Sequence, residues 1–440
     1  MNFEITSTII DIMKKIKILI FLTLIITFVS CTKKTTNSIV EDKLNLLLEQ
    51  KNYFQLEDEL LKNSNELSED RILYYNVFIN KAFGQRKKSN KEIEILLDKH
   101  KQTLNDTLIV KLLDVQASNY LFLYEYKKAA EIYTEILTTY KKVLDSTDLE
   151  NYKNTKNLFG TFSNVSPQKM HKKKDVTLKS YRNKFNHLMT PVKVGATNDE
   201  FIFDTGANLS TISESQAKKM KLKLFEQIVD IGSSTQKDVQ SKLALADSLY
   251  VGDILFENVL FIVMPDSQLT FPQINYAIKG IIGFPVINQL GEVHLHKNGK
   301  IFIPKVASKK TQKNMFFEGL NPVVRLSSKS DTLLFTFDTG ARNTELSFKY
   351  YKDHKSDVEK KGITQKNQRS GVGGEVEVKE YMLSNFQILI GQHKTSLDKI
   401  PVTLEEYGFN KYFDGNLGQD VFLKFNTLTI NFEYMDIDFK

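Results

Sequence analysis

One seven-residue pattern occurs twice in the chain and constrains what its second half can fold into. Residues 201–207 read Phe-Ile-Phe-Asp-Thr-Gly-Ala, and residues 335–341 read Phe-Thr-Phe-Asp-Thr-Gly-Ala. In each copy an apolar run ends on an aspartate, Asp204 or Asp338, which a threonine and a glycine follow. An aspartate at the end of a buried strand costs free energy unless a partner compensates for its burial. The pattern therefore predicts that each copy needs the other.

The two copies belong to a longer internal duplication. An offset of 134 residues superposes the two patterns, and an offset of 135 superposes the apolar, glycine-containing segment 280–287 on 415–422. Apolar residues alternate with polar ones throughout this half, and turn residues are frequent, which is typical of β-strands. We expect two β lobes, at residues 176–305 and 306–440, related by an approximate twofold axis.

The paired pattern resembles the aspartic proteases of the retropepsin and pepsin groups, over about residues 185–440. In that family each lobe supplies one Asp-Thr-Gly loop and one later apolar-apolar-Gly segment that braces it, here ending at Gly283 and Gly418. The resemblance implies an all-β bilobal fold, a peptide or protein substrate, and Asp204 and Asp338 as the catalytic residues. The alanine after each glycine is typical of retropepsins, and two lobes in one chain are typical of pepsins. A bacterial two-lobed member of the retropepsin-like group would show both features.

The resemblance also implies how the neighbours of the two aspartates support them. Thr205 and Thr339 would hydrogen-bond across the lobe interface and lock the two loops together. Gly206 and Gly340 would allow a tight turn and a close approach of the backbone. All four residues are present in this chain.

Other polar residues near the repeated segments have two interpretations each. Ser210 and Ser347 could hydrogen-bond near the dyad, but strand-edge serines are an equal alternative. Asp420 could be a buried partner, yet Pro285 holds the matching place in the first lobe, so the symmetry does not require it.

Two neighbouring carboxyls account for the residue types in the pattern. Held a few ångströms apart they cannot both ionise, so they share one proton and titrate as a unit. The ionised member can take a proton from water while the protonated member hydrogen-bonds the developing oxyanion. No metal, cofactor or covalent intermediate is required. Since Ala207 and Ala341 have no side-chain donor for the carboxylates, we expect a dyad less acidic than in pepsins, active at mildly acidic to neutral pH.

A protease of this kind needs a flap that covers the substrate and excludes water. Residues 370–374, Ser-Gly-Val-Gly-Gly, precede an alternating stretch and predict a hairpin with Gly371, Gly373 and Gly374 at its tip. The matching segment of the first lobe contains Gly232. An ordinary surface hairpin is the alternative in each lobe.

The N-terminus predicts secretion and lipidation. A basic stretch after Met13 precedes an apolar run over 18–29, which is too short to span a bilayer easily, and then the single cysteine, Cys31. This resembles a bacterial lipoprotein signal over residues 1–30, with translation starting at Met13 and Cys31 carrying the lipid. We expect a protein of the cell envelope that faces the periplasm and is held to a membrane by that lipid. An uncleaved anchor with an incidental thiol is the alternative.

Residues 31–160 predict helices, because apolar residues recur at helical spacing and proline is absent from 32 to 166. Three similar helix starts lie about 36 residues apart, and the last resembles the second helix of a tetratricopeptide repeat. A helical array without that repeat is the alternative. Arrays of this kind bind protein partners on a concave face. Turn residues and a basic run over 161–175 predict a linker.

Composition excludes some functions and leaves others open. The net charge of +7 is mild for 440 residues and lysines are interleaved with glutamates, so we expect no nucleic-acid partner. His294 and His296 lack a third ligand in the sequence, so we expect no metal. The prediction is thus an aspartic endopeptidase with a helical module. The competing hypotheses are a non-catalytic lipoprotein that binds peptides or proteins, a helical module whose lobes regulate a partner, and a dyad formed between two chains.

Overall fold

The fold comes from a computed structural model that describes residues 35–232, 238–329, 331–371 and 374–440. Met13, Cys31 and the rest of the predicted signal lie outside the described residues, and so does Gly373. Within the described part of the chain, no helix is long and apolar enough to cross a membrane.

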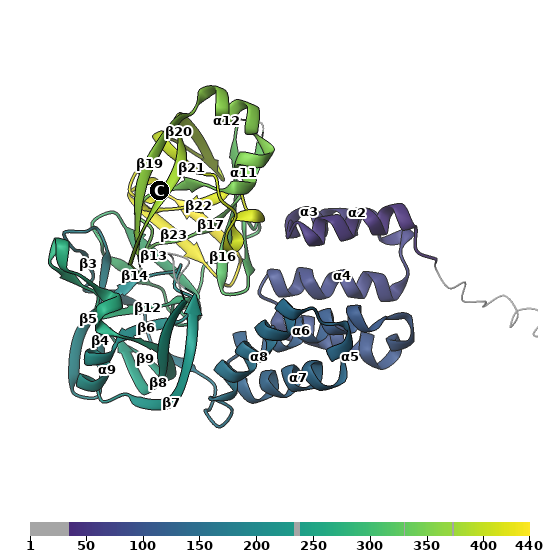
Figure 1. Ribbon diagram of the computed structural model, residues 1–440, viewed down its shortest axis with the longest axis horizontal. Helices are drawn as coiled ribbons and strands as arrows, with labels where there is room; N and C mark the ends of the chain where they lie inside the picture. Colours follow the sequence, from purple (N-terminus) through teal and green to yellow (C-terminus); the bar gives the residue numbers. More distant parts are fainter. Residues whose placement is uncertain (1–34, 233–237, 330, 372–373) are drawn as a thin grey trace, which may run out of the picture.

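Residues 38–160 form an all-helical region, as the apolar spacing predicts (Figure 1). Asparagine and aspartate side chains cap several helix N-termini, for example Asn105, which accepts a hydrogen bond from the backbone N–H of Leu108. Each helix from α2 to α7 has buried residues, as Ile93 and Leu96 are in α5. The helices are α2 (Ser38–Glu49), α3 (Tyr53–Lys62), α4 (Glu69–Ala82), α5 (Arg86–Lys99), α6 (Asp106–Phe122), α7 (Tyr126–Thr139) and α8 (Ser146–Gly160).

Three turns in the helical region share one backbone conformation. Lys51 between α2 and α3, Gly84 between α4 and α5, and Tyr124 between α6 and α7 have positive φ angles of 55°, 75° and 62°. The helices that follow these turns, α3, α5 and α7, are those in which the sequence shows its weak period. The array is therefore built from helix pairs with matching turns.

The first lobe is a sheet that curls back on itself. Its strands run in the order β1-β9-β6-β12-β5-β4-β8-β7, and an additional pairing of β8 with β9 closes the curl. The helix α9 (Glu214–Lys219) follows β6. The strands are β1 (Lys169–His171), β3 (Tyr181–Arg182), β4 (Leu188–Val194), β5 (Thr197–Phe203), β6 (Ser210–Ser213), β7 (Lys223–Gly232), β8 (Asp238–Val251), β9 (Ile254–Met264) and β12 (Gly280–Ile282).

The second lobe repeats this plan, with the order β15-β16-β17-β22-β18-β21-β20-β19 and a closing contact between β16 and β20. The helices α11 (Phe348–Asp353) and α12 (Lys355–Lys361) follow β18. The strands are β15 (Met315–Glu318), β16 (Asn321–Ser328), β17 (Asp331–Phe337), β18 (Glu345–Leu346), β19 (Ile363–Gly371), β20 (Gly374–Ile390), β21 (His393–Thr403) and β22 (Gly415–Leu417). The all-helical and bilobal all-β fold class is confirmed.

A five-stranded sheet joins the two lobes. Its order is β2 (Val176–Leu178), β14 (Ile301–Ile303), β13 (Glu292–His296), β23 (Thr427–Asn431) and β24 (Asp436–Phe439). The first three strands come from the first half of the duplication and the last two from the second, so neither half completes the sheet alone. In Figure 1 this sheet lies between the two lobes.

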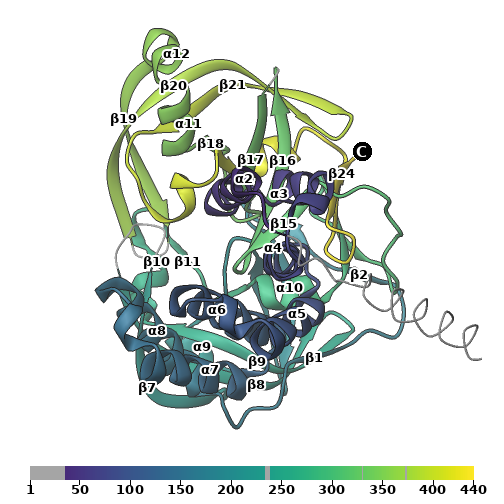
Figure 2. The same cartoon turned by 90° about the vertical axis from the view of Figure 1, so that its right-hand side faces the viewer.

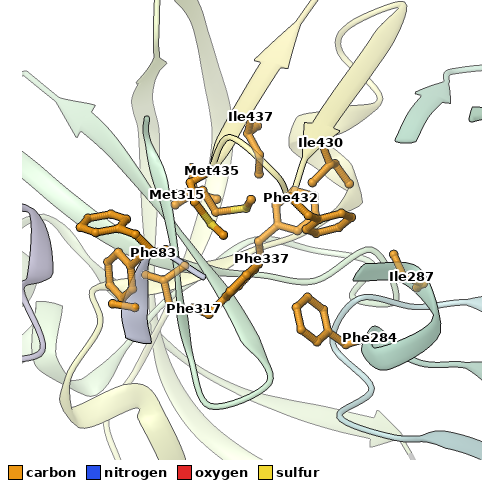
Figure 3. Packing of buried hydrophobic residues seen from close by; sticks show 14 of the residues in the cluster. Phe83, Phe284, Ile287, Met315, Phe317, Phe337, Ile430, Phe432, Met435 and Ile437 are labelled. Carbon is orange, nitrogen blue, oxygen red and sulfur yellow. The ribbon is translucent and has the colours of Figure 1, made fainter. Parts of the chain in front are cut away.

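The helical region packs against both lobes through one continuous hydrophobic core. Figure 3 shows Phe83, at the end of α4, beside Phe317 and Met315 of β15, with Phe284 and Phe432 further along the same core. Figure 2 shows the helices lying across the flank of both lobes. The helical region therefore shares a core with the lobes and is not an independently packed domain.

The segment predicted as a linker is folded against the first lobe. Phe162 is 1% exposed, and its ring meets that of Phe225 in β7 edge to face at 5.0 Å. Strand β1, at the end of the segment, pairs with β9. The composition of the segment, rich in turn residues and lysines, does not predict such contacts. One buried aromatic residue is enough to anchor a short segment, and its partner lies far away in the sequence.

Candidate active site

The two repeated aspartates lie at equivalent ends of strands in the two lobes. Asp204 follows β5, which pairs in parallel with β12, and its backbone N–H donates to Ile282 O at 3.0 Å. Asp338 follows β17, which pairs in parallel with β22, and donates to Leu417 O at 3.1 Å. Phe203 and Phe337 are buried, so alternation along each strand turns the aspartate away from the lobe core.

The two Asp-Thr-Gly loops meet face to face. A methyl group built on Gly206 would lie 2.4 Å from Asp338 Cγ, and one built on Gly340 would lie 2.4 Å from Asp204 Oδ2. Each glycine therefore abuts the carboxyl of the opposite lobe, and only glycine leaves it room. The structure thus brings together the two residues that the sequence predicts as a dyad.

The two threonines connect the loops through four hydrogen bonds. Thr205 Oγ1 accepts from the backbone N–H of Thr339 at 3.0 Å and donates to Phe337 O at 3.2 Å. Thr339 Oγ1 accepts from the backbone N–H of Thr205 at 3.0 Å and donates to Phe203 O at 3.2 Å. Both side chains are buried, so these bonds have no competition from water. This is the contact that the resemblance implies.

The surroundings of the two carboxyls differ. Asp338 Oδ1 accepts backbone N–H bonds from Gly340 at 2.7 Å and Ala341 at 2.9 Å, and Asp204 Oδ1 accepts one from Gly206 at 2.8 Å. The backbone of Gly340 and the side chain of Asp338 also hydrogen-bond to Asp204. Burial and then the negative charge of Asp338 raise the pKa of Asp204 well above its ordinary value. Two neighbouring carboxyls share one proton, and the raised pKa of Asp204 favours that proton on Asp204.

The bracing glycines pack directly behind the loops. A methyl group on Gly283 would lie 2.6 Å from Leu209 C, and one on Gly418 would lie 2.6 Å from Asn343 C. Their backbone N–H groups donate to side chains of the loops, Ser210 Oγ at 3.1 Å in the first lobe and Thr344 Oγ1 at 2.9 Å in the second.

The partner of Gly418 is a residue that the sequence reasoning missed. Thr344 lies 134 positions after Ser210, the same offset that superposes the two aspartates, so the duplication could have identified it. Ser347, considered instead, caps α11 by accepting from the backbone N–H of Tyr350. Asp420 Oδ1 accepts from the backbone N–H and the hydroxyl of Thr344, at 2.9 and 2.6 Å. Asp420 is therefore a half-buried partner that the first lobe lacks.

Gln419, also missed, holds the second loop from behind. Its Nε2 donates to Thr339 O at 2.9 Å, and its Oε1 accepts from Nη1 of Arg182, which comes from the first lobe. The matching residue of the first lobe, Phe284, keeps only the backbone bond, from its N–H to Ala207 O at 2.8 Å. No sequence signal pointed to Gln419, because the two halves differ there.

Each lobe carries a hairpin where a flap is expected. In the first lobe β7 pairs with β8, from the pair Lys223–Leu245 to the pair Gly232–Asp238, and Gly232 is the last residue of β7. In the second lobe β19 and β20 pair up to Gly371 and Gly374. Figure 2 shows the β19–β20 ribbon descending from the second lobe toward the first. Whether these hairpins cover a substrate stays a prediction.

An apolar cluster of the first lobe includes a neighbour of Asp204 on the same strand. Ile202 shares the face of β5 that carries Asp204, and it packs with Ala207 and Ile231. Beside it a cavity of about 250 Å³ is lined by Met189 and Tyr276 among others. Ile202 lines this cavity, and so do charged residues such as Asp199 and Lys279, so its lining is mixed.

Comparison with known proteins agrees with this geometry. The family model described as aspartyl protease matches residues 190–286, a stretch that contains Asp204 and Gly283. No curated protein matches the chain. The second Asp-Thr-Gly loop lies outside the matched residues, and its likeness to the first rests on the duplication and on the facing loops. Residues 190–286 are thus an aspartyl protease family domain, preceded by the helical region of residues 38–160.

Proposed function

We propose that the chain is an aspartic endopeptidase whose single catalytic dyad is formed by Asp204 and Asp338. The observation that carries this proposal is the facing pair of loops, in which each glycine abuts the opposite carboxyl. Four buried hydrogen bonds of Thr205 and Thr339 hold the pair together. A protein that only bound peptides would have no need to hold two carboxyls together, because their repulsion costs free energy.

In the proposed reaction Asp338 is the ionised member and Asp204 the protonated one. A water between the two carboxyls gives a proton to Asp338 while its oxygen attacks the carbonyl carbon of the peptide bond. Asp204 gives its proton to the carbonyl oxygen, which stabilises the charge that develops there. In the neutral diol that results, one hydroxyl returns a proton to Asp204, Asp338 protonates the leaving nitrogen, and the C–N bond breaks.

The substrate we propose is an extended peptide segment. The cavity lined by Ile202, Met189 and Tyr276 gives the first lobe a place for a substrate side chain. The hairpins β7–β8 and β19–β20 would close over it and exclude water.

A cleavage assay with a peptide library between pH 3 and 8 tests the proposal. The wild-type protein should cleave, a statine-type inhibitor should block cleavage, and the variants Asp204→Asn and Asp338→Asn should be inactive. Absence of cleavage by the wild-type protein at every pH would favour a binding protein that keeps the fold. Activity that falls on dilution would instead indicate a dyad formed between chains.

We further propose that the protein is tethered to a membrane of the bacterial cell envelope, facing the periplasm, through a lipid on Cys31. The basic and apolar segments before this cysteine support the proposal. We also propose that a protein partner binds the helical region on a surface that the lobes leave free.

A further inference from the structure

The three turns with positive φ form the edge of the helical region that meets the lobes. Lys51 pairs with Glu318 of β15, and its Nζ lies 4.7 Å from the ring centroid of Tyr412. A methyl group on Gly84 would lie 2.5 Å from Cε of Met435. Tyr124 Oη donates to Pro285 O at 2.7 Å. Matching turns of the helix pairs thus contact both lobes.

The backbone at these turns is strained where the residue is not glycine. A positive φ brings Cβ close to the backbone, so Lys51 and Tyr124 adopt it at a cost in free energy. Such conformations persist where the surroundings hold them, and they cluster at functional positions. For Tyr124 the surroundings are the lobe itself, because its side chain is buried and bonded there.

A short path of contacts leads from the Tyr124 turn to the first catalytic loop. Tyr124 bonds to Pro285 and the ring of Phe122 lies 6.2 Å from that of Phe284, both in α10 (Phe284–Gln289). The backbone N–H of Phe284 donates to Ala207 O at 2.8 Å, and Ala207 is the last residue of the repeated pattern. Only α10 separates the helical region from the loop that holds Asp204.

The same turn also reaches the second lobe. The ring of Phe122 lies 5.5 Å from that of Phe317 in β15. Next to Phe317 in β15, Glu318 accepts a hydrogen bond from Tyr53 Oη at 2.8 Å. The turn therefore contacts α10 of one lobe and β15 of the other, so a shift of the helices would act on both.

We propose that Phe122 and Tyr124 are positioning residues for the Asp204 loop, and that the helical region is part of the catalytic unit. They act by holding α10 in place, and α10 in turn holds Ala207. The expected changes in kcat and KM rest on the proposed peptidase function. The expected change in hydrogen exchange does not. It assigns the helical region the role of holding the Asp204 loop, in addition to binding any external partner.

Full-length variants with matched controls test the proposal. Tyr124→Phe removes the bond to Pro285, and Phe122→Leu removes the ring between the lobes. Tyr75→Phe is the control for the first, since Tyr75 is buried and its hydroxyl bonds within the helical region, to Asn45 Oδ1 at 2.8 Å and Glu41 O at 3.2 Å. Phe78→Leu is the control for the second, since the Phe78 ring packs against Tyr74 within α4.

The first readout is hydrogen exchange at the backbone amides of residues 204–207 and 284–287, which does not depend on activity. Exchange there should accelerate about fivefold in Tyr124→Phe and more in Phe122→Leu, since one hydrogen bond of ordinary strength is lost in the first. The two controls should leave it unchanged while lowering the melting temperature by a similar amount. Unchanged exchange in both test variants would overturn the proposal.

The second readout is the split between kcat and KM and the pH profile of kcat/KM. A loosened loop changes the distance between the carboxyls, so kcat should fall about fivefold with little change in KM, and the pH profile should shift. Equal kinetic effects in test and control variants would also overturn the proposal. If the wild-type protein cleaves nothing, the peptidase proposal fails, and the exchange measurement still decides whether the helices hold the loop.

Discussion

Thr205 and Thr339 exchange the same hydrogen bond in both directions, each hydroxyl oxygen accepting from the backbone N–H of the other residue at 3.0 Å. The arrangement is symmetric although the two lobes differ in sequence around it. It aligns the loops before any substrate binds, so the distance between the two carboxyls is a property of the folded protein.

Replacing Thr339 by valine should therefore destabilise the protein and abolish activity. The change keeps the volume but leaves the backbone N–H of Thr205 and the carbonyl of Phe203 buried without partners, at a cost of about 3 kcal/mol in the free energy of unfolding. Thr339→Ser keeps the hydroxyl and should cost about 1 kcal/mol. Urea unfolding measures both, and equal losses would show that the hydroxyl contributes nothing.

Asp204→Asn should be inactive yet more stable than the wild-type protein at neutral pH. Burial and Asp338 raise the folded-state pKa of Asp204, so stability declines as pH rises from the unfolded pKa through the folded one. Asparagine does not ionise and removes this decline. Calorimetry should find a higher melting temperature for the variant at pH 7 and no difference near pH 3, and activity should fall about 100- to 10,000-fold. A difference that is the same at every pH contradicts the prediction.

Gly206→Ala should abolish activity because the added methyl group would lie 2.4 Å from Asp338 Cγ. The loops would have to separate, which breaks the alignment of the dyad. Gly160→Ala is the control, since its methyl group would meet nothing closer than Ala130 Cβ at 3.9 Å. Kinetic assays should find the control fully active, and an active Gly206→Ala would show that the loops tolerate separation.

Glu318→Gln should weaken the attachment of the helical region at neutral pH but not in acid. Burial alone would raise the pKa of Glu318, but the charges of Lys81 and Lys51 outweigh it and the pKa is lowered. A lowered pKa means that the carboxylate contributes stability above its unfolded pKa and loses it as pH falls through the folded one.

The expected loss for Glu318→Gln is about 3 kcal/mol at pH 7, because one partner of a buried charge cluster is removed. Glu57→Gln is the matched control, since Glu57 also bridges to the second lobe, at 2.6 Å from Lys313, but in a more exposed place. It should cost under about 1 kcal/mol. Unfolding curves at a series of pH values from 7 downward measure both, and a Glu318 effect that does not shrink as the pH falls would contradict the assignment.

Cys31→Ser should release the protein from the membrane fraction. The single cysteine is the predicted lipidation site, and the apolar run before it is too short to span a bilayer easily. Cell fractionation and mass spectrometry of the mature N-terminus check this. A variant that stays in the membrane fraction would indicate an uncleaved anchor.

Much of the fold follows from local pattern. Alternating residues predict the strands of both lobes, and residues at helical spacing predict the helices of 38–160, since each of these periods is set within a few residues. The segment 161–175 shows the limit of such reasoning. Its composition is that of a linker, but Phe162 anchors it to Phe225, and that contact depends on where β7 lies.

Some residues of the candidate site could likewise be predicted from the sequence, and others could not. Asp204 and Asp338 could be paired from the sequence because a duplication repeats both the residue and its spacing. Thr344 could have been found by the same offset. Gln419 could not, because its counterpart is Phe284 and its partner Arg182 comes from the other lobe.

The sequence by itself determined that two Asp-Thr-Gly loops exist, that each follows an apolar strand, and that each is repeated with its brace. Only the tertiary structure decided that the loops face each other, that Gln419 bonds to Arg182 of the other lobe, and that Tyr124 reaches Pro285 across 161 positions of chain. The physical reason is that strands and turns depend on neighbours in sequence. Contacts between distant residues depend on how completed elements pack, and the pattern of any single segment does not contain that information.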